Sequence, residues 1–131
     1  MPDDRRRIPP KSTFEEQVGF TRAVRTGDRI LVAGTIGTGE DGHVVPGGAG
    51  AQADRAFELI RSYIEELGGR MEHLVRVRMF VTNIADADAV SAAFTRHCAC
   101  ATPTGTLVAI AALYRPEMLV EIEAEAVVQD D

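Results

Sequence analysis

Cysteine is scarce in this sequence of 131 residues, and no disulfide framework can be read from it. The only two cysteines, Cys98 and Cys100, stand two positions apart, too close for ordinary disulfide geometry. Two thiols are also far fewer than a disulfide-stabilised secreted domain carries. We therefore expect a reducing compartment, the cytoplasm, and we expect Cys98 to fill space as a small apolar group.

Long apolar runs and an excess of positive charge are also lacking. No run approaches the roughly 18 to 20 residues needed to cross a bilayer, and residues 1–11 are charged and proline-bearing, unlike a signal peptide. Acidic residues outnumber basic ones by 20 to 14, so the net charge of −6 would repel a phosphate backbone. These absences predict a soluble, unexported protein with neither a membrane nor a nucleic acid as partner.

Length and composition are those of one ordinary globular domain. The residues are 45% hydrophobic and 26% charged, and no internal repeat is present. Arg5, Arg6 and Arg7 precede Pro9 and Pro10, and we interpret this basic run as part of a solvated tail. We expect a flexible leader over residues 1–12 and a single domain over residues 13–131.

The first half of the chain predicts a hairpin, a loop and a helix. Residues 20–25 and 30–35 are typical of two strands joined by a turn, and the six glycines within residues 37–50 predict a loop. The stretch 51–67 predicts a helix, because its apolar residues recur every three or four positions: Ala53, Ala56, Phe57, Ile60, Ile64 and Leu67.

The second half predicts three strands and one helix. Strands are expected at 73–82, 106–112 and 119–128, and a helix over 86–98 with Asp86 as its cap. In the first of these strands, one face is expected to hold Val75, Val77, Met79 and Val81, and the other Leu74, Arg76, Arg78 and Phe80. The order ββαβαββ predicts an α+β sandwich whose sheet is covered on one face by both helices.

The opposite face of the sheet would carry charges of both signs. Arg76 and Arg78 come from one strand, and the row Glu121, Glu123 and Glu125 from the last. Such a face can meet water, but we favour a subunit interface, because opposite charges can pair while the apolar groups between them are buried. Like charges along the row would raise the pKa values of the three glutamates. Pairing with Arg76 and Arg78 would instead neutralise the glutamates, and from residue types alone we favour this pairing.

Motifs for nucleotides, metals and nucleophilic catalysis are missing. The glycines of residues 34–50 do not have the spacing of a phosphate-binding loop, and His43, His73 and His97 lack metal-ligand spacing. We interpret His97 as a packing histidine. The sequence therefore predicts no metal and no cofactor.

Several segments, taken together, resemble the YjgF/RidA family, which is also described as endoribonuclease L-PSP-like. Those segments are Gly-Phe-Thr-Arg-Ala-Val at 19–24, Ile-Leu-Val-Ala-Gly-Thr at 30–35, the helix with Gln52, Met-Phe-Val-Thr at 79–82, residues 103–107 and Val-Glu-Ile-Glu-Ala at 120–124. The better-known members are small homotrimers that hydrolyse reactive enamines and imines to ketones and ammonia. The resemblance implies a chorismate-mutase-like fold, a homotrimer with a central barrel and a small-molecule cleft at each subunit boundary.

The resemblance also implies the cleft residues. Glu121 would be the catalytic acid or base, and the substrate-binding positions would be Phe20, Ala33, Gly34, Ser91, Gly105, Thr106 and Leu107. In deaminating members an arginine stands at the position of Gly105 and holds the substrate carboxylate by a bidentate contact that glycine cannot copy. Phe20 lacks the usual hydroxyl and Leu107 replaces a smaller residue, so the pocket should be more apolar than in those members.

The sequence thus resembles the branch of the family that lacks the arginine, and two functions remain open. One is hydrolysis of an imine, an enamine or a related carbonyl compound at Glu121, with ordinary 2-imino acid deamination doubtful unless Arg22, Arg78 or Arg115 replaces the anchor from another position. The alternative is a non-catalytic metabolite-binding or regulatory trimer. RNA cleavage is disfavoured by the acidic balance.

Overall fold

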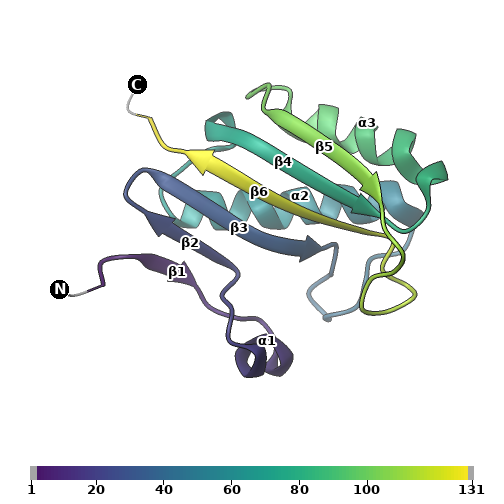
Figure 1. Cartoon of the computed structure of the whole chain (residues 1–131), viewed down its shortest axis with the longest axis horizontal. Helices are drawn as coiled ribbons and strands as arrows, with labels where there is room; N and C mark the ends of the chain where they lie inside the picture. The colour runs from purple at the N-terminus through teal and green to yellow at the C-terminus, as the bar shows by residue number, and fades with distance from the viewer. Residues whose placement is uncertain (1–2, 130–131) are drawn as a thin grey trace.

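The computed structural model describes residues 3–129 and builds them around a six-stranded sheet in the order β1-β2-β3-β6-β4-β5 (Figure 1). Neighbouring strands are antiparallel except β4 and β5, which are parallel and joined through a helix. The strands are β1 (Arg6–Ile8), β2 (Ala23–Thr26), β3 (Arg29–Ile36), β4 (Leu74–Val81), β5 (Thr104–Ala109) and β6 (Val120–Val127).

Two helices, α2 (Gly48–Glu66) and α3 (Ala87–Cys98), lie side by side against one face of the sheet (Figure 1). The apolar stripe of α2 explains its position, because Phe57, Ile60 and Ile64 are fully buried against the sheet residues Ile30 and Ile122. The opposite face carries no helix of comparable length (Figure 1). The two-helix layer on one face of the sheet is therefore confirmed, and so is the predicted order ββαβαββ from β2 onward, which β1 and α1 precede.

The expected faces of β4 are wrong at its first two residues. Leu74 is buried, and Val75 is 42% exposed, because the register between β4 and β6 shifts between Leu74 and Arg76. An irregularity of this kind exchanges the faces of the residues on one side of it. From Arg76 onward the alternation is as expected, with Val77 buried under the helices.

Several element boundaries and one expected cap also differ from expectation. Helix α2 begins at Gly48 rather than Ala51, and β5 covers Thr104–Ala109 rather than 106–112. Asp86 stands before α3 but makes no capping hydrogen bond through its side chain. Instead, the Asn83 side chain accepts a bond from the Ala85 N–H (2.9 Å) and caps a single 3₁₀ turn, Ile84–Asp86, that leads into α3.

Ordered structure begins before residue 13, within the segment expected to be a flexible leader. Arg6–Ile8 form β1 at the edge of the sheet, and Ile8 is buried. Helix α1 (Thr13–Val18) follows, with the Ser12 hydroxyl accepting the Glu15 N–H and Gly19 ending the helix at φ 98°. None of the helices within residues 3–129 combines the length and apolar character that crossing a membrane requires.

Candidate functional site

Glu121, the expected catalytic residue, lies on the sheet face that α2 and α3 leave uncovered. It belongs to the row of three glutamates on β6. In this row, Glu123 pairs with Arg78 on β4 (3.0 Å) and Glu125 pairs with Arg29 on β3 (3.3 Å). Within residues 3–129, Glu121 has neither an ion pair nor a hydrogen bond through its side chain. Within the described residues, pairing with arginines therefore neutralises two members of the row and leaves Glu121 as the member without an ion pair.

The environment of Glu121 disfavours its charged form. Burial raises the pKa of this carboxyl, the nearby Arg22 guanidinium offsets part of that effect, and the neighbouring Glu123 adds to it. A carboxyl with a raised pKa is better suited to exchange protons near neutral pH than an ordinary surface glutamate.

The missing side chain of Gly34 leaves the space that the Glu121 carboxylate occupies. Between Val32 and Thr35 the register of β3 against β6 shifts, so that Ala33 and Gly34 together oppose one residue of β6, which is a β-bulge. A Cβ atom built on Gly34 would lie 2.7 Å from Cδ of Glu121 and 2.9 Å from its Oε1. Only glycine therefore lets the carboxylate lie against the bulge.

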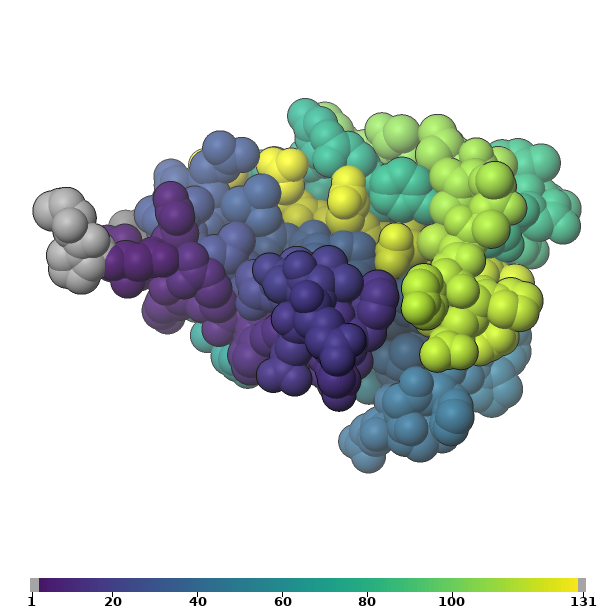
Figure 2. All heavy atoms as spheres, turned by 60° about the horizontal axis from the view of Figure 1, so that its bottom comes forward, coloured from purple at the N-terminus to yellow at the C-terminus, as the bar shows by residue number. Residues whose placement is uncertain are grey.

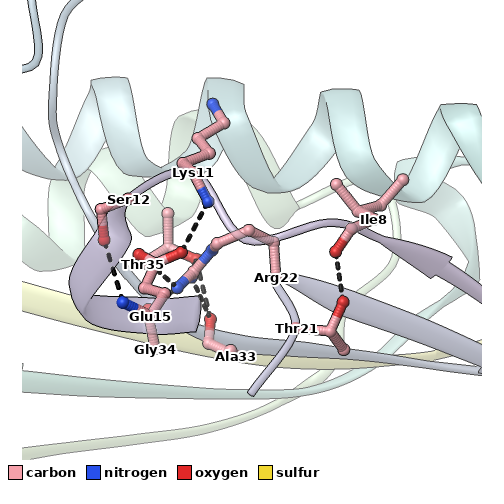
Figure 3. A network of polar contacts seen from close by, with 9 residues as sticks. All are labelled: Ile8, Lys11, Ser12, Glu15, Thr21, Arg22, Ala33, Gly34 and Thr35. Carbon is pink, nitrogen blue, oxygen red and sulfur yellow. Dashed lines mark hydrogen bonds and ion pairs between the residues drawn. The ribbon is translucent and has the colours of Figure 1, made fainter. Parts of the chain in front are cut away.

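Arg22 holds the bulge in shape, with its guanidinium directed at Ala33, Gly34 and Thr35 (Figure 3). Its Nη2 donates to the carbonyl oxygens of Gly34 (2.5 Å) and Ala33 (3.3 Å) and to the Thr35 hydroxyl (3.2 Å). Its Nη1 pairs with Glu15 of α1 at 3.4 Å, and the side chain is nearly fully buried. The guanidinium is thus occupied by the protein itself and fixes the backbone on which Glu121 rests.

The structure brings four of the expected site residues together. Phe20 lies beside Arg22, whose Cζ is 5.9 Å from the ring centroid, and Ala33, Gly34 and Glu121 meet at the bulge. We call Phe20, Ala33, Gly34 and Glu121 the open-face set. Phe20 is 37% exposed, so this set is accessible from outside the chain.

Gly105 and Leu107, in contrast, face the helix layer. Gly105 pairs with the buried Val77 and Leu107 pairs with the buried Met79, so both share the face that carries α3. Ser91 is exposed on α3, and we call Ser91, Gly105 and Leu107 the helix-side set. The alternate residue Thr106 pairs with Arg78 and lies on the open face.

Phe94 is a neighbour of Gly105 that sequence reasoning missed. A Cβ atom on Gly105 would lie 3.3 Å from Cζ and 3.5 Å from Cε2 of the Phe94 ring, which itself packs edge-on against Phe57. The ring therefore fills the space from which a longer side chain at position 105 would start. The sequence contains the matching large and small residues, but only the pairing of β5 with β4 shows that they meet.

None of the three arginines considered as substitute anchors lies free beside Glu121. Arg22 is committed to the bulge and Arg78 to Glu123. Arg115 stacks its guanidinium near the Tyr114 ring (5.7 Å) and lines a separate cavity to which Glu121 does not contribute. The open-face set therefore has a carboxylate but no unpaired cation within the described part of the chain.

His97 and Cys98, two other side chains that could react, lie in structural surroundings. His97 stacks on Phe57 (5.3 Å between ring centroids), and its Nε2 lies 2.9 Å from Oδ1 of Asp54, which agrees with the interpretation as a packing histidine. Cys98 is buried, which raises the pKa of its thiol to about 12. Across residues 3–129, no three His, Cys, Asp or Glu side chains gather to hold a metal ion.

The sheet, its two covering helices and the glutamate at the strand bulge define a small α+β protein. Comparison with known proteins identifies its family. Residues 11–128 match the endoribonuclease L-PSP family. The chain belongs to this family, the YjgF/RidA family that its segments resemble, and the fold predicted from that resemblance is confirmed.

Known relatives cover nearly the whole chain. A crystal structure of a member of the YjgF/YER057c/UK114 family from Mycobacterium tuberculosis is 34% identical, covers 95% of this chain and 100% of its own, and superposes with a TM-score of 0.85. An uncharacterized protein of Streptomyces coelicolor is 34% identical over 92% of this chain and 90% of its own. A 2-iminobutanoate/2-iminopropanoate deaminase of Dermatophagoides farinae is 26% identical over 84% of this chain and 86% of its own.

Proposed function

We propose that this protein is a homotrimer that hydrolyses a neutral imine or enamine in a cleft between subunits, with Glu121 as the acid and base. The observation that carries the proposal is the state of Glu121, a half-buried carboxyl with a raised pKa that lies against Gly34 without an ion-pair partner. The mite deaminase among the relatives supports the reaction class. We further propose that residues 13–131, together with β1 at the edge of their sheet, act as one domain and that the protein works in the cytoplasm.

The positions of the two residue sets support a cleft between copies. Glu121 pairs with Phe80 on the open face, whereas Gly105 pairs with Val77 on the face under α3. Opposite faces of one sheet cannot enclose the same small ligand, but the open-face set of one copy can meet the helix-side set of the next. The paired charges and apolar groups of the open face, which include Phe80 and Val75, suit burial between subunits.

The chemistry requires one group that first accepts and then donates a proton. Glu121 takes a proton from water as the water oxygen bonds to the imine carbon, and it passes this proton to the imine nitrogen, which gives a neutral carbinolamine. The carboxylate then takes the hydroxyl proton of the carbinolamine and delivers it to the amine nitrogen as the carbon–oxygen double bond forms and the carbon–nitrogen bond breaks. The products are a carbonyl compound and ammonia, and the carboxylate is restored.

The substrate class follows from what surrounds Gly105. Phe94 occupies the space beside this residue, Leu107 is apolar, and Phe20 brings an aromatic ring without a hydroxyl to the other set. A substrate carboxylate would find no guanidinium there, and losing a charge-assisted contact costs about 1.5 to 3 kcal/mol of binding free energy. We therefore propose uncharged substrates.

Replacing Glu121 by glutamine tests this function. We expect Glu121→Gln to lower the enzymatic hydrolysis of benzaldimine, released from benzylamine by an amine oxidase, by roughly 100-fold or more, because positioned acid–base catalysis contributes about that factor. Glu125→Gln is the matched control and should keep the rate, because Glu125 is paired with Arg29 and does not contribute to the raised pKa of Glu121. Ammonia and benzaldehyde release above the spontaneous rate are measured, with 2-iminopropanoate as the anionic comparison substrate.

Stability separates this role from a structural one. A carboxyl whose pKa is raised on folding stabilises the fold most below its unfolded pKa, near 4.5, and this contribution is lost as the pH rises through its folded pKa. Glu121→Gln should therefore be at least as stable as the wild type at pH 7. Equal turnover of the two variants, or a loss of stability in Glu121→Gln at pH 7, would contradict the proposal.

The alternative is a non-catalytic trimer that binds a metabolite in the same cleft. The Phe94 ring beside Gly105, where a substrate-binding arginine would otherwise start, favours this alternative. This protein would bind benzaldehyde or a related carbonyl compound saturably without accelerating imine hydrolysis. Turnover by the wild type above the spontaneous rate decides between the two functions.

A further inference from the structure

A cavity of about 640 Å³ lies between two loops at one end of the sheet. Its walls are residues Thr38 and 42–48 on one side and Arg115 and 117–119 on the other. Figure 2 shows these loops facing each other, the first in blue and the second in yellow-green. None of the open-face or helix-side residues lines this cavity, so it is separate from the site described above.

Both walls are anchored to α2, so the cavity is built into the fold. The buried Gln52 side chain donates to the Glu117 carbonyl oxygen (3.0 Å) and accepts from the Leu119 N–H (2.9 Å). On the other side, Nε of Arg55 donates to the Thr38 carbonyl oxygen (2.7 Å). A pocket of this size with fixed walls is within the range of small-molecule sites.

The lining combines an apolar surface with one charge of each sign. The apolar side chains are Val44, Val45, Pro46, Met118 and Leu119. The charged side chains are Arg115 and Glu117, and neither has an ion pair within residues 3–129. His43 also lines the cavity, and within residues 3–129 its hydrogen bonds come from its backbone: the N–H donates to Oδ1 of Asp41 (3.0 Å) and the carbonyl oxygen accepts the Gly39 N–H (2.8 Å).

We infer that this cavity binds a free α-amino acid with an apolar side chain. Arg115 can pair with the carboxylate of the ligand and Glu117 with its ammonium group, while the apolar lining receives the side chain. A ligand with only one charge would leave either Arg115 or Glu117 without a partner. The inference is independent of the proposed function, because no residue is shared with the Glu121 site.

Four compounds with the same aromatic body test the inference: L-phenylalanine, 3-phenylpropanoate, 2-phenylethylamine and 2-phenylethanol. We expect L-phenylalanine to bind most tightly and to shift the backbone amide resonances of residues 42–48 and 117–119 in a nuclear magnetic resonance titration. Arg115→Ala should weaken the binding of L-phenylalanine and of 3-phenylpropanoate about tenfold or more and leave the binding of 2-phenylethylamine unchanged. Glu117→Gln should weaken the binding of L-phenylalanine and of 2-phenylethylamine and leave the binding of 3-phenylpropanoate unchanged.

An exposed ion pair elsewhere on α2 supplies the matched controls. Arg61→Ala and Glu65→Gln remove the same charges from a pair that lies outside the cavity, and neither should alter binding. Glu121→Gln should also bind L-phenylalanine as the wild type does, which separates this test from that of the proposed function. Equal binding of the four compounds, equal effects of Arg115→Ala and Arg61→Ala, or no resonance shifts at 10 mM ligand would each overturn the inference.

Discussion

Gly37→Ala should lower the free energy of unfolding by about 3 kcal/mol or more, because the new methyl group would overlap the backbone of α2, which packs directly against the backbone of Gly37. A Cβ atom on Gly37 would lie 2.2 Å from the carbonyl oxygen of Gln52 in α2. The strand cannot withdraw easily, since the Gly37 carbonyl oxygen accepts the Val45 N–H (3.0 Å). Urea unfolding measures the loss.

Gly39→Ala is the control for this substitution in the same loop. Its Cβ atom would meet Oδ1 of Asp41 at 3.3 Å and Cγ1 of Val45 at 3.7 Å, both at the ends of side chains that can move. We expect a change within about 1 kcal/mol. Similar losses for the two variants would show that α2 does not press against the end of β3.

Gly105→Arg should fail to create an anchor for carboxylates while Phe94 is present. The new side chain would start 3.3 Å from the Phe94 ring, and overpacking of this kind costs about 1 to 3 kcal/mol of unfolding free energy. In the double variant Gly105→Arg/Phe94→Ala the ring is absent. Its loss of unfolding free energy should therefore be smaller than the sum of the losses of the two single variants. The double variant should also bind pyruvate roughly tenfold or more tightly than the wild type.

Gly105→Arg/Phe14→Ala is the matched control, because Phe14 lies on α1 and its ring contacts Tyr114 (4.9 Å between centroids) rather than position 105. It removes an equal ring without making room for the arginine and should not gain pyruvate binding. Thermal unfolding and calorimetric titration measure the two effects. Pyruvate binding by Gly105→Arg alone, at the level of the double variant, would show that Phe94 does not block the position.

Regular patterns made most of the fold predictable. The three- and four-residue spacing of α2 and the alternation of β6 reflect burial on one face, so both elements and their faces could be read directly. At the start of the chain, Ile8 is a single buried residue among polar ones and carries no periodic signal. Helix α1 had a signal that was missed, since Ser12 and Glu15 have the spacing of a capping box.

Irregularities set the limits of prediction. The shift near Leu74 and the bulge at Ala33 and Gly34 arise from the pairing of strands far apart in the sequence, so local alternation does not show them. For the same reason, residue types could name three glutamates as candidates but could not single out Glu121. That distinction depends on which arginine lies across from each glutamate, and Glu125 pairs with Arg29 rather than with the expected arginines of β4.

The oligomeric state tests the central claim of this account, that the Glu121 site is complete only where copies meet. Within one chain, Glu121 and Gly105 lie on opposite faces of the sheet, so a lone subunit has two incomplete sets. Sedimentation equilibrium at micromolar concentration should give a mass near 42 kDa, three times the 14.1 kDa of the chain. A single species of 14.1 kDa that still hydrolyses benzaldimine through Glu121 would contradict it.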